Sequence, residues 1–163
     1  MPEAVVVAAT RSPIGRANKG SLVDMRPDDL ATQVVTSLMD RSGVDTGEVE
    51  DLIMGCGQPA GESGYNIGRV VAVETGMPDV PGVTVNRYCS SSLQTTRMAA
   101  HAIKAGEGDC FISAGVETVS RFMSGMSDGM PGSTNPKFDA ARARTAERAQ
   151  GGAGAWAPPE GLP

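Results

Sequence analysis

Residues 82–106 read GVTVNRYCSSSLQTTRMAAHAIKAG, and this stretch decides the fold class. The β-branched run at 82–86 predicts a buried strand, and residues 90–105 predict a helix that ends at Gly106. A strand that leads directly into a helix is the unit from which α/β proteins are built. We therefore expect a largely parallel sheet whose two faces are covered by helices.

The same alternation continues on both sides of this stretch. Proline suits the first turn of a helix and glycine often ends one, so Pro27 and Gly43 bracket a further predicted helix. Another short helix is predicted at 66–75. Apolar runs of the strand type occupy residues 4–9, 51–56 and 109–116. The predicted order is β-α-β-α-β-α-β, with the run at 4–9 as a buried first strand.

Residues 120–163 have a different composition from the rest of the chain. They hold 7 glycines and 5 prolines in 44 positions, and residues 138–150 are their one helical candidate. All of the predicted strands lie within residues 1–119. The sequence therefore predicts two parts, a folded α/β unit at 1–119 and a separate segment at 120–163.

Charge and cysteine content exclude several classes of function. The 163 residues carry 14 Lys and Arg against 19 Asp and Glu, a net charge of −5, which disfavours binding to the phosphates of nucleic acids. The apolar runs are shorter than the roughly 20 residues of a membrane span, and the N-terminus shows no signal-peptide pattern. Three widely spaced cysteines indicate neither a disulfide framework nor a metal site. We expect a cytoplasmic protein with free thiols and no bound metal.

Cys89 is the candidate for chemistry, because it lies between a predicted strand and a predicted helix. The positive end of a helix dipole favours a thiolate, which is the form that attacks a carbonyl carbon. The small residues at 90–92 leave room for an acyl group, and the amide of Cys89 could donate to an oxyanion. A simple buried thiol is the alternative interpretation of the same position.

Three motifs, taken in order along the chain, resemble the thiolase family. They are TRSPIG at 10–15, NRYCSSSLQ at 86–94 and SAGVETVS at 113–120. The resemblance implies a thiolase-like α/β fold, with residues 1–119 as the N-terminal half-domain. Residues 120–163 would then be the beginning of the inserted loop domain, which binds coenzyme A. Cys89 would be the catalytic nucleophile.

The resemblance also implies an activity, that of an acetyl-CoA C-acyltransferase. Such an enzyme cleaves 3-ketoacyl-CoA to acyl-CoA and acetyl-CoA, or runs the reverse condensation, through an acyl-cysteine intermediate. Residues 87–91 are most similar to the degradative 3-ketoacyl-CoA thiolases of fatty-acid β-oxidation. Coenzyme A is then a substrate, no resident cofactor is expected, and the family similarity predicts a homodimer or homotetramer.

The chain departs from the thiolase pattern in its general base and its second cysteine. The family's Gly-His-Pro motif and its later catalytic cysteine have no counterpart in these residues. The single histidine, His101, would lie about 18 Å from Cys89 along a continuous helix, so it is not the base. We expect this chain to be the N-terminal portion of a thiolase and to be inactive alone.

Several alternatives remain open at this level. A decarboxylating ketoacyl synthase of the same fold can share the sequence motif CSSSL at 89–93. A non-catalytic acyl-CoA-binding protein could also retain the thiolase-like architecture. Arg144 and Arg148 share one helix face and are candidates for the phosphates of coenzyme A, with an ordinary solvated face as the alternative. Cys56 and Cys110 are expected to be core thiols without chemistry.

Overall fold

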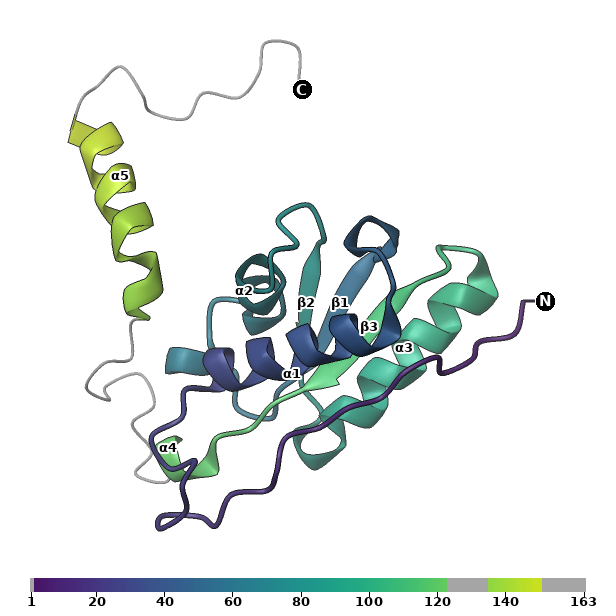
Figure 1. Cartoon of the computed structure of the whole chain (residues 1–163), viewed down its shortest axis with the longest axis horizontal. Coiled ribbons are helices and arrows are strands. Elements are labelled where there is room, and N and C mark those ends of the chain that lie inside the picture. Colours follow the sequence, from purple (N-terminus) through teal and green to yellow (C-terminus); the bar gives the residue numbers. More distant parts are fainter. Residues whose placement is uncertain (1, 123–134, 151–163) are drawn as a thin grey trace. The chain divides into compact units, whose positions relative to one another are not determined.

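The computed structural model describes residues 2–122 and 135–150, and a three-stranded sheet organises the first of these ranges (Figure 1). The chain divides into two compact units, residues 1–133 and 134–163, each of which is described by itself. In the second unit, the described residues form a short 3-10 turn at Pro136–Phe138 and helix α5 at Asp139–Gln150. The sheet and all of the other helices belong to the first unit.

The sheet is parallel throughout and has the strand order β2-β1-β3. Its strands are β1 (Asp51–Gly55), β2 (Gly82–Val85) and β3 (Phe111–Gly115). In this register the central Leu52 lies opposite Gly82 on one side and Ile112 on the other. The predicted α/β class with a parallel sheet is confirmed.

Helices cover both faces of the sheet, as predicted. They are α1 (Pro27–Ser42), α2 (Ile67–Glu74) and α3 (Ser91–Ala105), and a short further helix, α4 (Val119–Phe122), follows β3. Helices α1 and α2 pack together on one face, and α3 packs against β1 and β3 on the other. Gly43 and Gly106 end α1 and α3 in left-handed conformations, with φ of 67° and 76°, which glycine adopts without strain.

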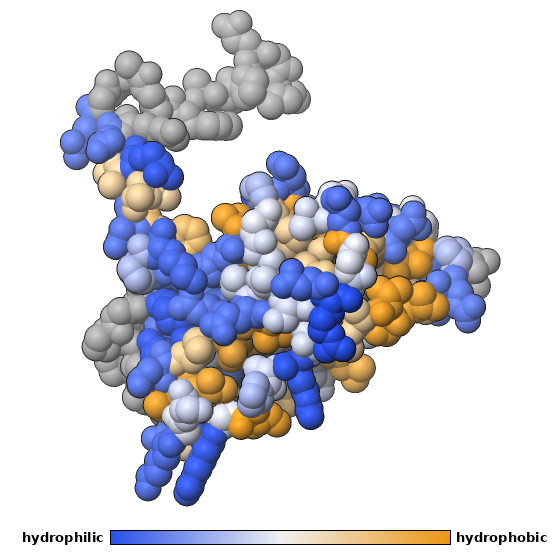
Figure 2. All heavy atoms as spheres, viewed as in Figure 1, coloured by the Kyte–Doolittle hydropathy of each residue, from blue (hydrophilic) through white to orange (hydrophobic). Residues whose placement is uncertain are grey.

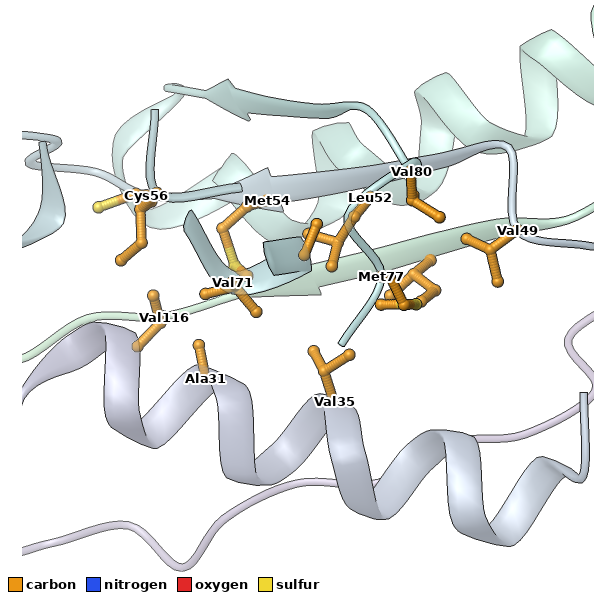
Figure 3. Packing of buried hydrophobic residues seen from close by; sticks show 13 residues of the cluster. Ala31, Val35, Val49, Leu52, Met54, Cys56, Val71, Met77, Val80 and Val116 are labelled. Atoms are coloured by element: carbon orange, nitrogen blue, oxygen red, sulfur yellow. The ribbon is translucent and has the colours of Figure 1, made fainter. Parts of the chain in front are cut away.

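The core lies between the sheet and the α1–α2 face. Leu52 and Met54 of β1 are fully buried there, and in Figure 3 the side chains of Ala31 and Val35 point from α1 toward the sheet. Each large apolar side chain buried in this way contributes roughly 1.5–3 kcal/mol. Because side chains alternate along a strand, Gly55 faces the opposite helix, α3.

The prediction of a buried first strand at residues 4–9 is wrong. None of the described residues 2–16 belongs to a strand, and Val5, Val6 and Val7 are 71–79% exposed. Hydrophobic residues are accordingly visible on the surface near the N-terminal end (Figure 2). A β-branched run becomes a strand only when a neighbouring edge pairs with its backbone. Here residues 4–12 instead line a cavity of about 660 Å³ together with parts of α1, α3 and β3.

A network of ion pairs connects the start of α1 to Glu62 and to helix α4, which follows β3. Arg26 lies 3.0 Å from Asp28 and 3.2 Å from Glu62, and Arg121 of α4 also pairs with Glu62. Hydrogen bonding to Glu62 is the largest cause of the raised pKa of Arg121. Both carboxylates are buried, so the arginines compensate for the loss of hydration of these charges.

Candidate active site

Polar groups gather where the three parallel strands end. Parallel strands have all their carboxyl ends at one edge of the sheet, and this is the edge where α/β proteins bind ligands. Here β1 leads into Gly57, β2 leads into Asn86 and Cys89, and β3 leads into Glu117. The fold therefore brings together three segments that are far apart in the sequence.

The N-terminus of α3 packs directly on the sheet at this edge. A Cβ built on Gly55 would lie 2.7 Å from the carbonyl carbon of Ser91, and one built on Gly115 would overlap the hydroxyl of Ser92. A Cβ at Gly55 would therefore require the start of the helix to shift, whereas one at Gly115 would require the Ser92 side chain to turn away. Thr95 adds a hydroxyl contact of 2.8 Å to Ser113 of β3. Small and hydroxylated residues thus fix where α3 begins.

Cys89 lies in the tight turn Tyr88–Ser90 that links β2 to α3. The hydroxyl of Ser91 accepts a 2.8 Å hydrogen bond from the Arg87 amide and donates a 2.7 Å bond to the Tyr88 carbonyl. Tyr88 has a φ of 49°, which non-glycine residues rarely adopt. This turn presents an exposed Cys89 immediately before the positive end of α3.

A series of hydrogen bonds connects this turn to the ends of the other two strands. Asn86 accepts a 2.8 Å bond from the Tyr88 amide and donates a 3.0 Å bond to the Gly57 carbonyl. The Gly57 amide in turn donates to the carboxylate of Glu117. The backbone beside Cys89 is therefore linked to the segments that follow both β1 and β3.

The other two thiols lie in different surroundings. All three cysteines are among the described residues, and of these only Cys89 is exposed. Burial, assisted by the negative charge of Glu117, raises the pKa of the Cys56 thiol to about 11. Burial also raises the pKa of Cys110, which is partly buried rather than fully in the core. A neutral thiol is a poor nucleophile, so the geometry favours Cys89 for attack on a carbonyl.

The single histidine, which its spacing excludes as the base, lies further along the chain than Cys89, within α3. His101 is exposed on α3. Arg144 and Arg148 belong to α5 of the second unit, where Arg144 is exposed and the side chain of Arg148 is outside the described set. The assignment of these two arginines to coenzyme A stays a prediction. Within the described ranges no group of His, Cys, Asp and Glu is placed to hold a metal ion, and no helix could span a membrane.

Asn86 and Glu117 lie within two of the family-like motifs and Gly57 lies in the glycine-rich turn after residues 51–56, but the sequence alone makes none of the three a candidate catalytic residue. The available signal was their position, because each follows a strand of the same parallel sheet. Their hydrogen-bond partners could not be predicted from the sequence. The three residues are separated by up to 60 positions and meet only through the pairing of the strands.

Residues 4–147 match the family model described as "Thiolase, N-terminal domain". A 3-ketoacyl-CoA thiolase of Bacillus subtilis is 45% identical over 122 residues, which is 74% of this chain and 31% of the relative. A β-ketoadipyl-CoA thiolase of Acinetobacter baylyi is 44% identical over 138 residues, 82% of this chain and 34% of the relative.

The 3-oxoadipyl-CoA/3-oxo-5,6-dehydrosuberyl-CoA thiolase of Escherichia coli is 42% identical over 123 residues, 74% of this chain and 30% of the relative. The chain thus spans about a third of the length of the curated relatives it matches. The family match covers the strands, the helix and the turn that carry Cys89. On these grounds the chain belongs to the thiolase family, through its N-terminal domain.

Proposed function

We propose that this chain supplies the nucleophile of a thiolase-type acyltransferase and that Cys89 is that nucleophile. The observation that carries the proposal is the exposed thiol in the turn before α3, at the carboxyl edge of a parallel sheet. Cys56, whose pKa is raised to about 11, is a far weaker candidate at neutral pH. The substrate class is a 3-oxoacyl thioester of coenzyme A, the feature common to the names of the relatives.

In the cleavage direction, the Cys89 thiolate attacks the 3-keto carbon of the substrate. The bond between the α and β carbons then breaks, the acyl group remains on the Cys89 sulfur, and the departing acetyl-CoA carbanion takes up a proton. The thiol of a second coenzyme A then gives its proton to a base and attacks the thioester, so that the acyl group passes to coenzyme A and Cys89 leaves as a thiolate. The amide N–H of Cys89 is the candidate donor to the oxyanion in both steps.

These steps require a base for the thiol proton and an acid for the carbanion. His101 is exposed on the flank of α3 and serves neither role in this proposal. We propose that a longer polypeptide containing this chain supplies both groups. The purified 163-residue chain is then expected to show no thiolysis, and measurable turnover by it would contradict this part of the proposal.

Several finer assignments belong to the same proposal. Two relatives carry names that refer to adipyl or related dicarboxylic substrates and others to 3-ketoacyl-CoA in general, so we propose the degradative direction, as in β-oxidation. Coenzyme A acts as a substrate, and Arg144 and Arg148 of α5 are proposed to meet its phosphates. A cytoplasmic homodimer or homotetramer is the proposed form of the whole enzyme.

Acyl transfer to Cys89 is the direct test. The longest polypeptide that contains residues 1–163 is incubated with acetyl-CoA at neutral pH, and its peptides are mapped by mass spectrometry. We expect one acyl adduct, on Cys89, which is lost in Cys89→Ser and retained in the matched variant Cys110→Ser. No adduct on Cys89 would favour the non-catalytic acyl-CoA-binding alternative. A strong preference for acyl groups on a carrier protein would favour the ketoacyl synthase.

A further inference from the structure

Asn86 uses both ends of its side-chain amide within the turn that carries Cys89. Its oxygen accepts a 2.8 Å hydrogen bond from the amide of Tyr88, and its nitrogen donates a 3.0 Å bond to the carbonyl of Gly57. An amide is the side chain that can accept at one end and donate at the other. Asn86 therefore bridges the Cys89 turn and the end of the central strand β1.

The far side of this bridge is fixed by Glu117. The Gly57 amide donates to the Glu117 carboxylate, so the peptides on both sides of Gly57 have partners at this edge of the sheet. Gly57 also packs closely against the turn, because a Cβ built on it would lie 3.3 Å from Cα of Tyr88 and 3.2 Å from the Glu117 carboxylate. Gly57 is thus held by β1, which precedes it, and by Glu117, which follows β3. Its carbonyl in turn holds the side chain of Asn86.

The turn needs this support because of its backbone. Tyr88 has a φ of 49°, a conformation that costs a non-glycine residue free energy and persists only when its surroundings hold it. Its amide points at Asn86, and the next residue is Cys89. A change at Asn86 would release Tyr88 toward an ordinary conformation and would rotate the Cα–Cβ bond of Cys89.

We propose that Asn86 is a positioning residue for the nucleophile and that Glu117 acts in the same way one step further back, through Gly57. The inference rests on the proposed function of Cys89. Neither side chain reacts: the two hold the thiol in the orientation from which it meets the thioester or keto carbon. Misplacement of a reacting atom by about 1 Å can lower a rate by about 10²-fold.

A positioning role predicts a split between two reactions of the same thiol. Acylation of Cys89 by acetyl-CoA needs the correct approach to a bound acyl group, whereas alkylation by iodoacetamide, a small neutral reagent, needs only an exposed thiol. In Asn86→Ala we expect the acylation rate to fall about 10²-fold and the alkylation rate to change little. Asn86→Asp keeps the acceptor for the Tyr88 amide and loses the donor to the Gly57 carbonyl. Its acylation rate should therefore lie between those of the wild type and Asn86→Ala.

Asn66, the residue just before α2, offers a matched control beside the same strand. It also uses both ends of its amide, donating a 2.7 Å bond to the Gly82 carbonyl and accepting a 2.8 Å bond from the Thr84 hydroxyl, both on β2. Asn66→Ala should lower the melting temperature and leave the ratio of acylation to alkylation at the wild-type value. A fall of this ratio in Asn66→Ala equal to that in Asn86→Ala would overturn the proposal, since both effects would then reflect general destabilisation.

Glu117 supplies a rescue test that does not depend on the folding of Asn86→Ala. Glu117→Gln retains an oxygen that can accept from Gly57 and should keep most of the acylation rate, whereas Glu117→Ala should lose it. Both reactions are followed in the longest polypeptide that contains this chain. A wild-type protein that is never acylated on Cys89 overturns the proposed function and the role of Asn86 with it. A wild-type protein that is acylated while Asn86→Ala reacts at the same rate overturns only the positioning role.

Discussion

The first residue of α3 is in direct contact with the central strand at Gly55, where a Cβ would lie 2.7 Å from the carbonyl carbon of Ser91. This approach places the positive end of the helix at the carboxyl edge of the sheet. It also fixes the position of the Cys89 turn relative to the sheet, because the hydroxyl of Ser91 forms hydrogen bonds with the backbone of both Arg87 and Tyr88. One small residue on β1 therefore decides where the candidate nucleophile lies.

Gly55→Ala should move α3 away from the sheet. Overpacking of this kind typically costs 1–3 kcal/mol, so we expect the free energy of unfolding to fall by roughly 2 kcal/mol and the acylation of Cys89 to fall with it. Gly106→Ala at the other end of α3 is the control: its positive φ makes alanine cost about 1 kcal/mol, but the helix start is unaffected. Urea unfolding and acylation rates of the two variants distinguish these outcomes. Equal acylation in both would contradict the prediction.

The three thiols should differ in reactivity in the order of their exposure. At pH 8, iodoacetamide should modify Cys89 first, the partly buried Cys110 more slowly and the buried Cys56 only after unfolding. Peptide mapping by mass spectrometry after increasing reaction times gives the three rates. Early modification of Cys56 would mean that this edge of the sheet opens readily.

Stability at high pH should depend on Cys56. Its pKa is about 11 in the folded protein and 9.0 for an unperturbed thiol, so the folded state keeps the proton more tightly than the unfolded state. The contribution of the protonated Cys56 thiol to the free energy of unfolding is fully present below pH 9 and is lost as the pH rises toward 11. Cys56→Ala should therefore show a smaller loss of unfolding free energy between pH 8 and pH 11 than the wild type. The control is Val35→Ala, a buried substitution that removes no titratable group, so the loss of unfolding free energy between pH 8 and pH 11 should stay close to that of the wild type.

The buried carboxylate of Glu62 should contribute more to the stability of the fold than an exposed carboxylate does. Glu62→Gln leaves Arg26 and Arg121 facing a neutral group in a buried site, and loss of a buried charge partner typically costs about 3–5 kcal/mol. Asp139→Asn breaks the exposed pair with Arg142 and should change the stability by at most about 1 kcal/mol. Thermal unfolding of both variants measures the difference. Similar melting temperatures would show that solvent reaches Glu62.

The N-terminal valines should contribute little to the stability of this chain. Val6 is 79% exposed, and Val35 of α1 is 2% exposed. Val6→Ser should change the free energy of unfolding by less than about 0.5 kcal/mol, whereas Val35→Ala should lower it by roughly 2 kcal/mol. Chemical denaturation of the two variants is the measurement. A large effect of Val6→Ser would indicate that residues 4–9 are buried in solution.

Local sequence was sufficient for much of the fold. The helices predicted between Pro27 and Gly43, at 66–75 and at 90–105 lie close to the observed Pro27–Ser42, Ile67–Glu74 and Ser91–Ala105. The signals that predict these helices act within one or two turns of the helix, so they do not depend on the rest of the chain. The run at 4–9 failed because strand formation depends on a partner edge, which a local pattern does not specify.

For the candidate site, the sequence by itself determined that a cysteine follows a strand and precedes a helix. Only the tertiary structure decided that Cys89 is exposed while Cys56 is buried, and that Asn86 and Glu117 meet through Gly57. The physical reason is that a helix cap or a turn is formed by neighbours in the chain. A hydrogen bond between residues 29 or 60 positions apart exists only after parallel strands have paired and brought their carboxyl ends to one edge.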